Sequence, residues 1–439
     1  MMNGLQSLTE LAFAPIEEIV RQQEMLLRQQ VAYVANASPW YREQFRQLTL
    51  DPNRIRTLDD LLQLPCTRKQ DIEGREQDFV CQPDSGLVDV CLTSGTTSEP
   101  VPFFQSELDL QRLALNEELT FRAAGICQQD RVVIAAAIDR CFMAGLAYFL
   151  GLRRIGATAI RGGSSSVAVV AQLIRRFRPT AIVGVPTLML ALARRLEEEG
   201  IDPRRCGVKK LICIGEPVRQ ASLELSILGV RLQDSWQAQV FGTYASTEMA
   251  TTFGDCLHQC GGHLHPQLIH IELLDDEERP VADGTPGEVV ATPLQVTGMP
   301  LLRFKTGDIA TLHRQPCACG RNSWRLGPIL GRKDHRLKVR GTTLFPSMIF
   351  SALQELEEVV ASYVEVYDDY ALCDRIRVVV ACRGEQPVAC TIADHLCARL
   401  RITPEVVIQD VATVQKTMIR EDKRKPVQLF DYRERSRLA

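Results

Sequence analysis

No run of apolar residues in this chain reaches the roughly 20 residues that cross a membrane. The longest run covers residues 181–193 and suits a buried strand followed by the start of a helix. Positive charge is not in excess either, since the formal net charge is −3, so we expect neither a nucleic-acid partner nor a membrane partner. The opening residues contain glutamates but no basic residue before Arg21, and we therefore expect neither a signal peptide nor a transit peptide.

The sequence also lacks internal repeats and low-complexity tracts, and its composition is that of a globular protein. Of its 439 residues, 45% are hydrophobic and 24% are charged. A chain of this length exceeds what one hydrophobic core accommodates, so two or three domains are expected. Fifteen cysteines without an export signal favour reduced thiols in the cytoplasm, where a cysteine cluster binds metal more often than it forms disulfides.

A loop rich in hydroxyl groups follows the apolar segment 87–92. It gathers Ser94, Gly95, Thr96 and Thr97 in one short stretch. Hydroxyls and backbone N–H groups of such a loop can face a single point and bind a polyanion such as a triphosphate. Clusters of this composition are more often solvated turns, so the loop alone does not decide the function.

Apolar strands alternate with helices between residues 131 and 214. We expect strands at 131–137, 158–160, 181–185 and 210–214, and helices at 143–154, 167–177 and 188–199. This alternation predicts an α/β fold with a largely parallel sheet covered on both faces. Ligands of such sheets bind beyond the carboxyl ends of the strands, and Gly215, Glu216 and Pro217 follow the fourth strand.

The two ends of the chain have a different pattern. The first eighty residues are polar and helical, with helix starts near Ser38 and Thr57. Residues 260–345 read as short strands, and an α+β unit of about a hundred residues follows, the size of a small separate domain. In that unit we expect helices at 347–358 and 392–400 and strands at 363–367, 375–381 and 406–409.

Three further segments carry groups suited to a nucleotide. The segment 244–248 is expected to form one short turn after a strand. It combines the aromatic Tyr244, which can cover a purine, with the Glu248 carboxylate, an oxygen ligand that suits Mg²⁺. Asp308 is expected to follow another strand, where it can accept both hydroxyls of a ribose. The third segment, 331–334, lies where the β-rich region meets the last domain, and Lys425 stands six residues before Asp431 in that domain.

In this order, the segments resemble the adenylate-forming enzymes, and within them the phenylacetate–coenzyme A ligase family. The resemblance covers nearly the whole chain. The matching segments are residues 36–42, 62–72, 93–97, 215–217, 244–248, 331–334 and 340–346.

The resemblance implies a large N-terminal domain, residues 1–332, with mostly parallel sheets flanked by helices and a β-rich subdomain. A small mobile α+β domain, residues 333–439, would rotate between two half-reactions. In the first, a carboxylate attacks MgATP to give an acyl-adenylate and pyrophosphate; in the second, the thiol of coenzyme A displaces AMP. Such reactions depend mainly on positioning and charge neutralisation.

The resemblance also implies roles for individual residues. Ser94, Gly95, Thr96 and Thr97 would hold phosphates, and Thr247 and Glu248 would hold Mg²⁺. The nucleotide would further contact Gly215, Glu216, Pro217, Tyr244, Ala245, Ser246, Asp308, Arg332 and Gly341.

Lys425 is expected to stabilise negative charge during adenylation, in a site that excludes water. Lys423 and Arg424 replace the family's usual small residue and glycine, so Lys423 is a rival for this role. The phosphate loop departs from the family as well, because Ser98 stands for a glycine and no lysine follows Pro100.

A second constellation consists of cysteines and histidines in two clusters. The first cluster holds Cys256, His258, Cys260, His263 and His265, and the second holds Cys317 and Cys319. Four such ligands suit a structural zinc ion. Some relatives carry zinc here, and the register of the resemblance selects Cys256, His263, Cys317 and Cys319. His258, Cys260 and His265 remain substitutes.

The resemblance places the acid between the second helix of the sheet region and the turn at 244. Phe142, Tyr148, Pro186 and Ala245 are the expected walls, and a flat aromatic acid such as benzoate, anthranilate or phenylacetate is the expected substrate. Alternatives are transfer of the acyl-adenylate to a carrier-protein arm or an amine, and a non-catalytic nucleotide-binding relative. A homodimer also stays open.

Overall fold

The computed structural model describes residues 10–93, 100–164, 166–339, 342–370, 373–383, 389–419 and 426–433. These residues form two compact units. The first consists of residues 10–93, 100–306 and 310–328, and the second consists of residues 307–309 and the described residues after 328. The predicted functional boundary between residues 332 and 333 stays a prediction.

The centre of the first unit is a nine-stranded sheet with the order β13-β14-β9-β8-β7-β6-β5-β3-β4. Strands β4, β3, β5, β6 and β7 are parallel, and β8 and the strands beyond it are antiparallel. The strands are β3 (Arg131–Ala135), β4 (Thr158–Arg161), β5 (Ala181–Gly184), β6 (Lys210–Cys213), β7 (Gln239–Ser246), β8 (Thr251–Gly254), β9 (Gly262–His263), β13 (Leu312–His313) and β14 (Arg325–Leu326).

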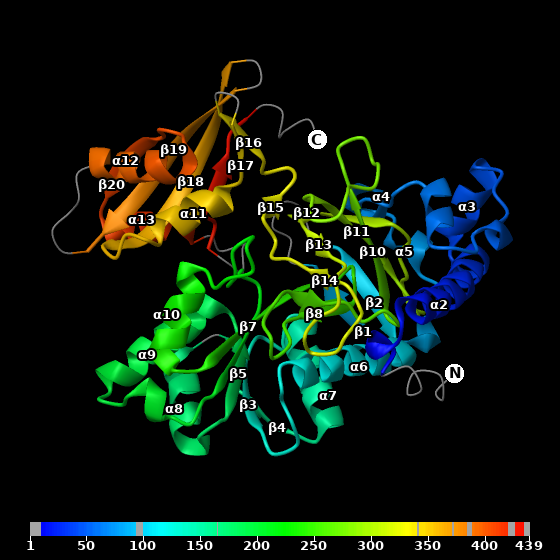
Figure 1. Cartoon of the computed structure of the whole chain (residues 1–439), viewed down its shortest axis with the longest axis horizontal. Coiled ribbons are helices and arrows are strands. Elements are labelled where there is room, and N and C mark those ends of the chain that lie inside the picture. Colours follow the sequence, from blue (N-terminus) through cyan, green and yellow to red (C-terminus); the bar gives the residue numbers. More distant parts are fainter. Residues whose placement is uncertain are drawn as a thin grey trace. The chain divides into compact units, whose positions relative to one another are not determined.

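Helices cover both faces of the parallel strands, as the alternation in the sequence predicts (Figure 1). Alternate residues of one strand face opposite cores: Val133 packs with α8, α9 and α10, whereas Val132 and Ile134 pack with α6 and α7. These helices are α6 (Glu107–Ala123), α7 (Met143–Ile155), α8 (Val167–Phe177), α9 (Pro186–Glu198) and α10 (Ile227–Trp236). The predicted α/β fold class is confirmed.

The N-terminal helices pack on a second β-region of the same unit. Their apolar side chains form one core with Phe103 and with Leu294, Leu301 and Phe304. The elements are η1 (Leu11–Phe13), α2 (Ile16–Ala37), α3 (Pro39–Gln47), η2 (Pro52–Arg54), η3 (Asp59–Gln63), α4 (Lys69–Ile72), α5 (Glu76–Phe79), η4 (Asp84–Gly86), β1 (Leu87–Leu92), β2 (Pro102–Ser106), β10 (Ile269–Leu274), β11 (Gly287–Pro293) and β12 (Phe304–Ala310). The short helix η5 (Pro203–Arg205) packs instead against α9 and α10. As expected, Ser38 caps α3, since its Oγ accepts from the Tyr41 N–H at 3.3 Å.

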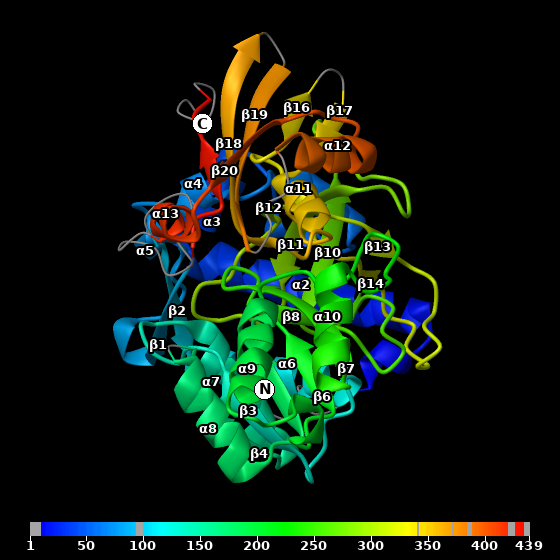
Figure 2. The same ribbon diagram turned by 90° about the vertical axis from the view of Figure 1, so that its left-hand side faces the viewer.

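The second unit contains a four-stranded sheet with the order β20-β19-β18-β21. Its helices lie on both faces, with α11 and α12 on one side and α13 on the other (Figure 2). The elements are β15 (Gly331–Arg332), β16 (Leu337–Val339), β17 (Thr342–Leu344), α11 (Pro346–Leu353), β18 (Val359–Tyr370), β19 (Cys373–Cys382), α12 (Ala389–Leu400), β20 (Glu405–Gln409), α13 (Val411–Met418) and β21 (Leu429–Asp431).

The helix expected at 347–358 is shorter in the structure. It ends at Leu353, and the strand β18 begins at Val359. Within the described residues, no helix combines the length and the apolar character needed to cross a bilayer.

Candidate functional site

The end of strand β6 carries one of the predicted nucleotide segments. Gly215 adopts a φ of +71°, a conformation that favours glycine. The carboxylate of Glu216 then accepts hydrogen bonds from the backbone N–H of Thr187 at 3.1 Å and from its hydroxyl at 2.9 Å. Since α9 begins at Pro186, Glu216 holds the first turn of that helix in place beside the end of the sheet. Pro186, an expected wall of the acid pocket, is buried there.

The segment 244–248 does not form one short turn. Strand β7 continues to Ser246, because its residues pair with β8, and Ser246 faces Thr251. The ring of Tyr244 stacks on Phe253 with centroids 5.9 Å apart. Only after Ser246 does the chain turn, and it reaches β8 through Ala250 at a φ of +47°. The strand thus holds the aromatic ring, and the turn holds Thr247 and Glu248.

Thr247 and Glu248 line a small cavity that is open to solvent. Asp109 and Arg112 of helix α6 line it as well. Arg112 is 1% exposed, and its guanidinium donates to the carbonyl oxygens of Leu294, at 2.7 Å, Leu268 and Ala250. Burial lowers the pKa of Arg112 to about 10, which leaves it cationic at neutral pH. The cavity therefore combines the carboxylates of Glu248 and Asp109 with the Thr247 hydroxyl and a buried arginine.

Sequence reasoning did not find Asp109 and Arg112, although one signal was present. Ser106 and Asp109 form a capping box at the start of α6, a pattern readable from residue spacing. The Asp109 carboxylate also accepts from the backbone N–H groups of Thr297, at 2.8 Å, and Gly298, at 2.7 Å. These contacts fix the start of the helix from which Arg112 projects.

Asp308 and Arg332, predicted to contact the ribose, lie side by side in the second unit. The expectation that Asp308 follows a strand is wrong. Asp308 lies inside β12, opposite Arg332 of β15. The Arg332 Nε donates to the Asp308 carboxylate at 3.1 Å. A Cβ at Gly331 would lie 2.3 Å from the Phe345 ring, so only glycine fits beside Arg332. The structure therefore brings these two predicted residues together.

Several predicted residues lie outside the part of the chain that the structure describes. They are Ser94, Gly95, Thr96, Thr97, Gly341, Lys423 and Lys425. Their roles stay predictions.

The expected walls of the acid pocket belong to the first unit. Phe142 directly precedes α7, and Tyr148 lies within that helix, 5% exposed, with its ring 5.8 Å from that of Phe121 in an edge-on contact. Ala245 is exposed on β7. Their part in binding an acid stays a prediction.

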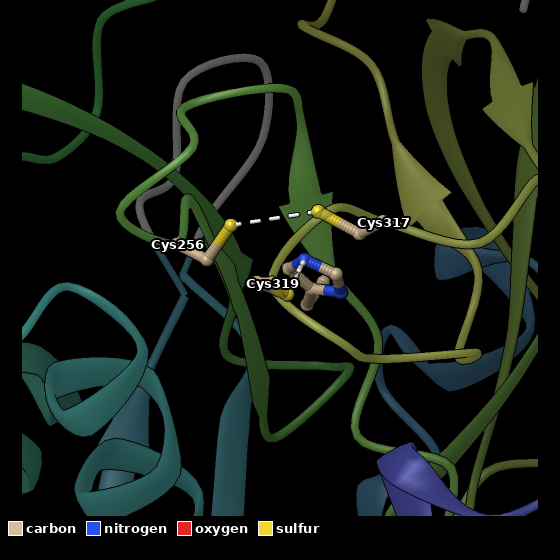
Figure 3. A group of neighbouring side chains, drawn as sticks. Cys256, Cys317 and Cys319 are labelled. Carbon is tan, nitrogen blue, oxygen red and sulfur yellow. Dashed lines mark hydrogen bonds between the residues drawn. The ribbon is translucent and has the colours of Figure 1, made fainter.

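Four predicted metal ligands come together between β8, β9 and the loop before β14. The ligand atoms of Cys256, His263, Cys317 and Cys319 all lie within 4.8 Å of one another. The Sγ atoms of Cys256 and Cys317 are 3.7 Å apart (Figure 3), and the Sγ of Cys319 is 3.5 Å from Nε2 of His263. A tetrahedral zinc ion with Zn–S bonds of about 2.3 Å places two sulfurs about 3.8 Å apart. The four side chains thus have the spacing of a closed metal site.

The three substitute ligands lie differently. His265 is 4% exposed, and its Nε2 lies 3.0 Å from the hydroxyl of Thr120. His258 is exposed at the surface. Cys260 lies closer, with its Sγ 3.3 Å from that of Cys317, and stays an alternative thiol.

The surroundings of the cluster fix its ligands. Burial lowers the pKa of His263 to about 3, so its imidazole is neutral at pH 7 and able to bind a metal. Its other nitrogen, Nδ1, lies 3.5 Å from the Ser323 hydroxyl, and Arg321 donates to the Cys319 sulfur at 3.4 Å. Such contacts orient metal ligands and offset thiolate charge.

Residues 19–298 match the family of AMP-binding enzymes. The phenylacetate–coenzyme A ligase of Thermus thermophilus is 29% identical over 81% of this chain and 79% of that protein. The phenylacetate–coenzyme A ligase of Escherichia coli is also 29% identical, over 80% of this chain and 79% of that protein. A solved structure of 2-hydroxyisobutyryl-CoA ligase in the postadenylation state, in complex with 2-HIB-AMP, shares the fold with a TM-score of 0.83. The two sequences are 23% identical, and the match covers 95% of this chain and 90% of that chain.

The fold and the matched segments define an adenylate-forming enzyme. The chain belongs to the family of AMP-binding enzymes, and its resemblance to the phenylacetate–coenzyme A ligases within that class is confirmed.

Proposed function

We propose that this chain converts an aromatic carboxylic acid into its coenzyme A thioester in two steps driven by ATP. In the first step, a carboxylate oxygen of the acid bonds to the α-phosphorus of ATP, and the bond to pyrophosphate breaks. In the second, the thiol of coenzyme A bonds to the acyl carbon, loses its proton, and AMP leaves. The predicted class of enzyme, an AMP-forming acid–coenzyme A ligase, is confirmed by the family match together with the related ligases.

The observation that carries the proposal is the family match over residues 19–298, which includes the segment 244–248. Within that segment, Thr247 and Glu248 line the cavity described above. A carboxylate there would hold Mg²⁺, and the metal would neutralise phosphate charge when bound.

The proposed nucleotide contacts follow the sequence. Tyr244 and residues 215–217 would enclose the adenine, and Asp308 would accept the ribose hydroxyls with Arg332 beside it. Ser94, Gly95, Thr96 and Thr97 would hold the phosphates, and Lys425 would stabilise charge during adenylation. Lys423 stays the rival for that role.

The aromatic character of the acid is the finer part of the proposal. It is supported by the printed names of the two relatives, which are phenylacetate–coenzyme A ligases. Phe142 and Tyr148, at the start of α7 and within it, would supply flat apolar walls.

A structural zinc ion belongs to the same proposal. The spacing of Cys256, His263, Cys317 and Cys319 supports it, as does the neutral state of the imidazole. With four protein ligands the ion would have no open position, so it would stabilise the fold rather than take part in the reaction. The cysteine side chains that the structure describes form no disulfide bond, which also supports the proposed cytoplasmic location.

The test is an assay of pyrophosphate release over a panel of aromatic and aliphatic acids, with and without coenzyme A. We expect release with aromatic acids, and an acyl thioester only when coenzyme A is present. Acyl-adenylate that accumulates without transfer to coenzyme A would instead favour a carrier-protein arm or an amine as acceptor. Intact ATP with every acid would overturn the proposal.

A further inference from the structure

Helix α6 buries a glutamate that none of the proposed roles uses. Glu117 is 2% exposed. Its Oε1 accepts hydrogen bonds from the Thr252 hydroxyl at 2.6 Å and from the side-chain amide of Asn116 at 3.0 Å. Its second oxygen, Oε2, has no hydrogen-bond partner in the described part of the chain. Buried carboxyl oxygens are normally satisfied, so this one requires an explanation.

The environment of Glu117 is apolar enough to shift its titration. Burial raises its pKa to about 7, even though the two hydrogen bonds act in the opposite direction. When Glu117 is ionised, this oxygen is a hydrogen-bond acceptor in a low-dielectric environment, where a hydrogen bond is stronger than in water. A donor that reaches it from outside the protein would be bound selectively.

Glu117 contacts two elements, α7 and β8, that lie beside expected walls of the acid pocket. Helix α7 presses directly on it, since a Cβ at Gly151 would lie only 2.4 Å from the Glu117 Cβ. Tyr148 lies one turn earlier on α7, and burial, followed by the charge of Glu117, raises the pKa of its phenol. On the other side, Thr252 is the cross-strand partner of Ala245. Tyr148 on α7 itself, and Ala245 on β7, the neighbour of β8, are the predicted walls.

A purely structural role accounts for only one of the two carboxyl oxygens. Asn116 and Glu117 together tie α6 to β8, because the backbone N–H of Thr252 also donates to the Asn116 side chain at 3.1 Å. The Oε1 of a glutamine would accept from Thr252 equally well. The second oxygen adds nothing to this tie, yet it is the atom that makes burial costly.

We infer that Glu117 is a specificity-determining residue of the acid pocket, whose free oxygen accepts a hydrogen bond from an amino or hydroxyl group on the acid. This inference rests on the proposed function and narrows it to amino- or hydroxy-substituted aromatic acids. Sites with a buried acceptor discriminate strongly against analogues that lack the donor, because the acceptor is then left unpaired.

The test compares acids that differ only in the donor. We would measure kcat/KM for pyrophosphate release with benzoate and with its amino- and hydroxy-substituted forms, for the unaltered enzyme and for Glu117→Gln. The quantity of interest is the ratio of the best donor-bearing acid to benzoate. We expect a ratio of at least about 10 in the unaltered enzyme and a fall of about tenfold or more in Glu117→Gln. The exposed Glu107→Gln, on the same helix, is the matched control and should keep the ratio.

Other outcomes overturn the inference in distinct ways. An unchanged ratio in Glu117→Gln, or an equal loss for all acids, would show that the residue only supports the fold. Should Glu117→Gln fail to fold, Glu117→Asp withdraws the same oxygen and should lower the ratio likewise. Calorimetric binding of 2-aminobenzoate and benzoate gives the ratio without turnover, so it separates failure of this inference from failure of the proposed function.

Discussion

Arg433 and Asp374 form a buried ion pair in the second unit, with Nη1 of the arginine 3.2 Å from Oδ2 of the aspartate. The two side chains are 3% and 0% exposed. Asp374 also accepts from the backbone N–H of Lys338 at 2.6 Å, and Arg433 donates to the carbonyl of Arg336 at 3.0 Å. The pair therefore ties the segment after β15 to the start of β19 and to the chain after β21.

Removal of Arg433 should be strongly destabilising. The change Arg433→Ala leaves Asp374 buried without its cation, and loss of one partner of a buried pair costs about 3–5 kcal/mol. Urea unfolding followed by circular dichroism measures the free energy of unfolding. The matched control is Arg399→Ala, because the pair of Arg399 with Glu355 is exposed and worth at most about 1 kcal/mol. Equal losses in the two variants would contradict this interpretation.

The parallel part of the fold could be predicted from the sequence almost to the residue. The helix expected at 167–177 is α8, and the strand expected at 210–214 is β6, one residue shorter. Both predictions are confirmed because the hydrophobic pattern of each segment, bounded by polar residues, is compatible with few other elements in an α/β protein. The resemblance to a family added the order of the functional segments.

The predictions that failed depend on cross-strand partners. Ser246 belongs to a strand because it pairs with Thr251, and Asp308 belongs to one because it faces Arg332. Cross-strand pairing is not visible in a local sequence pattern, so such a pattern predicts strand ends that are too early. Local sequence patterns also do not show which histidine reaches the second cysteine cluster. In the structure, β9 pairs with β14, and His263 lies beside Cys319. The burial of a glutamate at position 117 had no signal in the sequence.

Loss of one thiol should empty the proposed zinc site. We expect one zinc ion per chain by native mass measurement, and none in Cys317→Ser, with a lower melting temperature. The loop that carries Cys317 and Cys319 also holds the N-terminal segment, because the backbone N–H of Asn322 donates to the carbonyl of Ala12 at 2.7 Å. The matched control is Cys127→Ser, an exposed cysteine outside the cluster, which should keep the metal. Unchanged metal content in Cys317→Ser would remove the proposal.

Lys425 should matter for one half-reaction and not for the other. The change Lys425→Ala is expected to lower the rate of adenylation by about 10²–10³-fold, since it removes a charge aimed at the transition state. Transfer of a preformed acyl-adenylate to coenzyme A should persist. Pyrophosphate release and thioester formation measure the two steps separately. If Lys423→Ala has the larger effect on adenylation, the rival lysine has the role.

Glu117 should make the stability of the protein depend on pH in a defined direction. Its pKa is about 7 in the folded chain against 4.5 for an ordinary glutamate. Between these values the folded state keeps a proton that the unfolded state has lost, so stability falls as the pH rises from about 4.5 to 7. The loss amounts to at most about 3 kcal/mol and is complete above pH 7.

The change Glu117→Gln removes this titration and keeps the hydrogen bond from Thr252. The free energy of unfolding of the variant minus that of the unaltered protein should therefore increase between pH 4.5 and 7 and stay constant above. Because the difference is taken at each pH, groups that titrate in both proteins cancel. Chemical unfolding at half-unit steps of pH measures it, with Glu107→Gln as the exposed control. A difference that does not vary with pH would mean that Glu117 ionises normally, and its second oxygen would then have a partner after all.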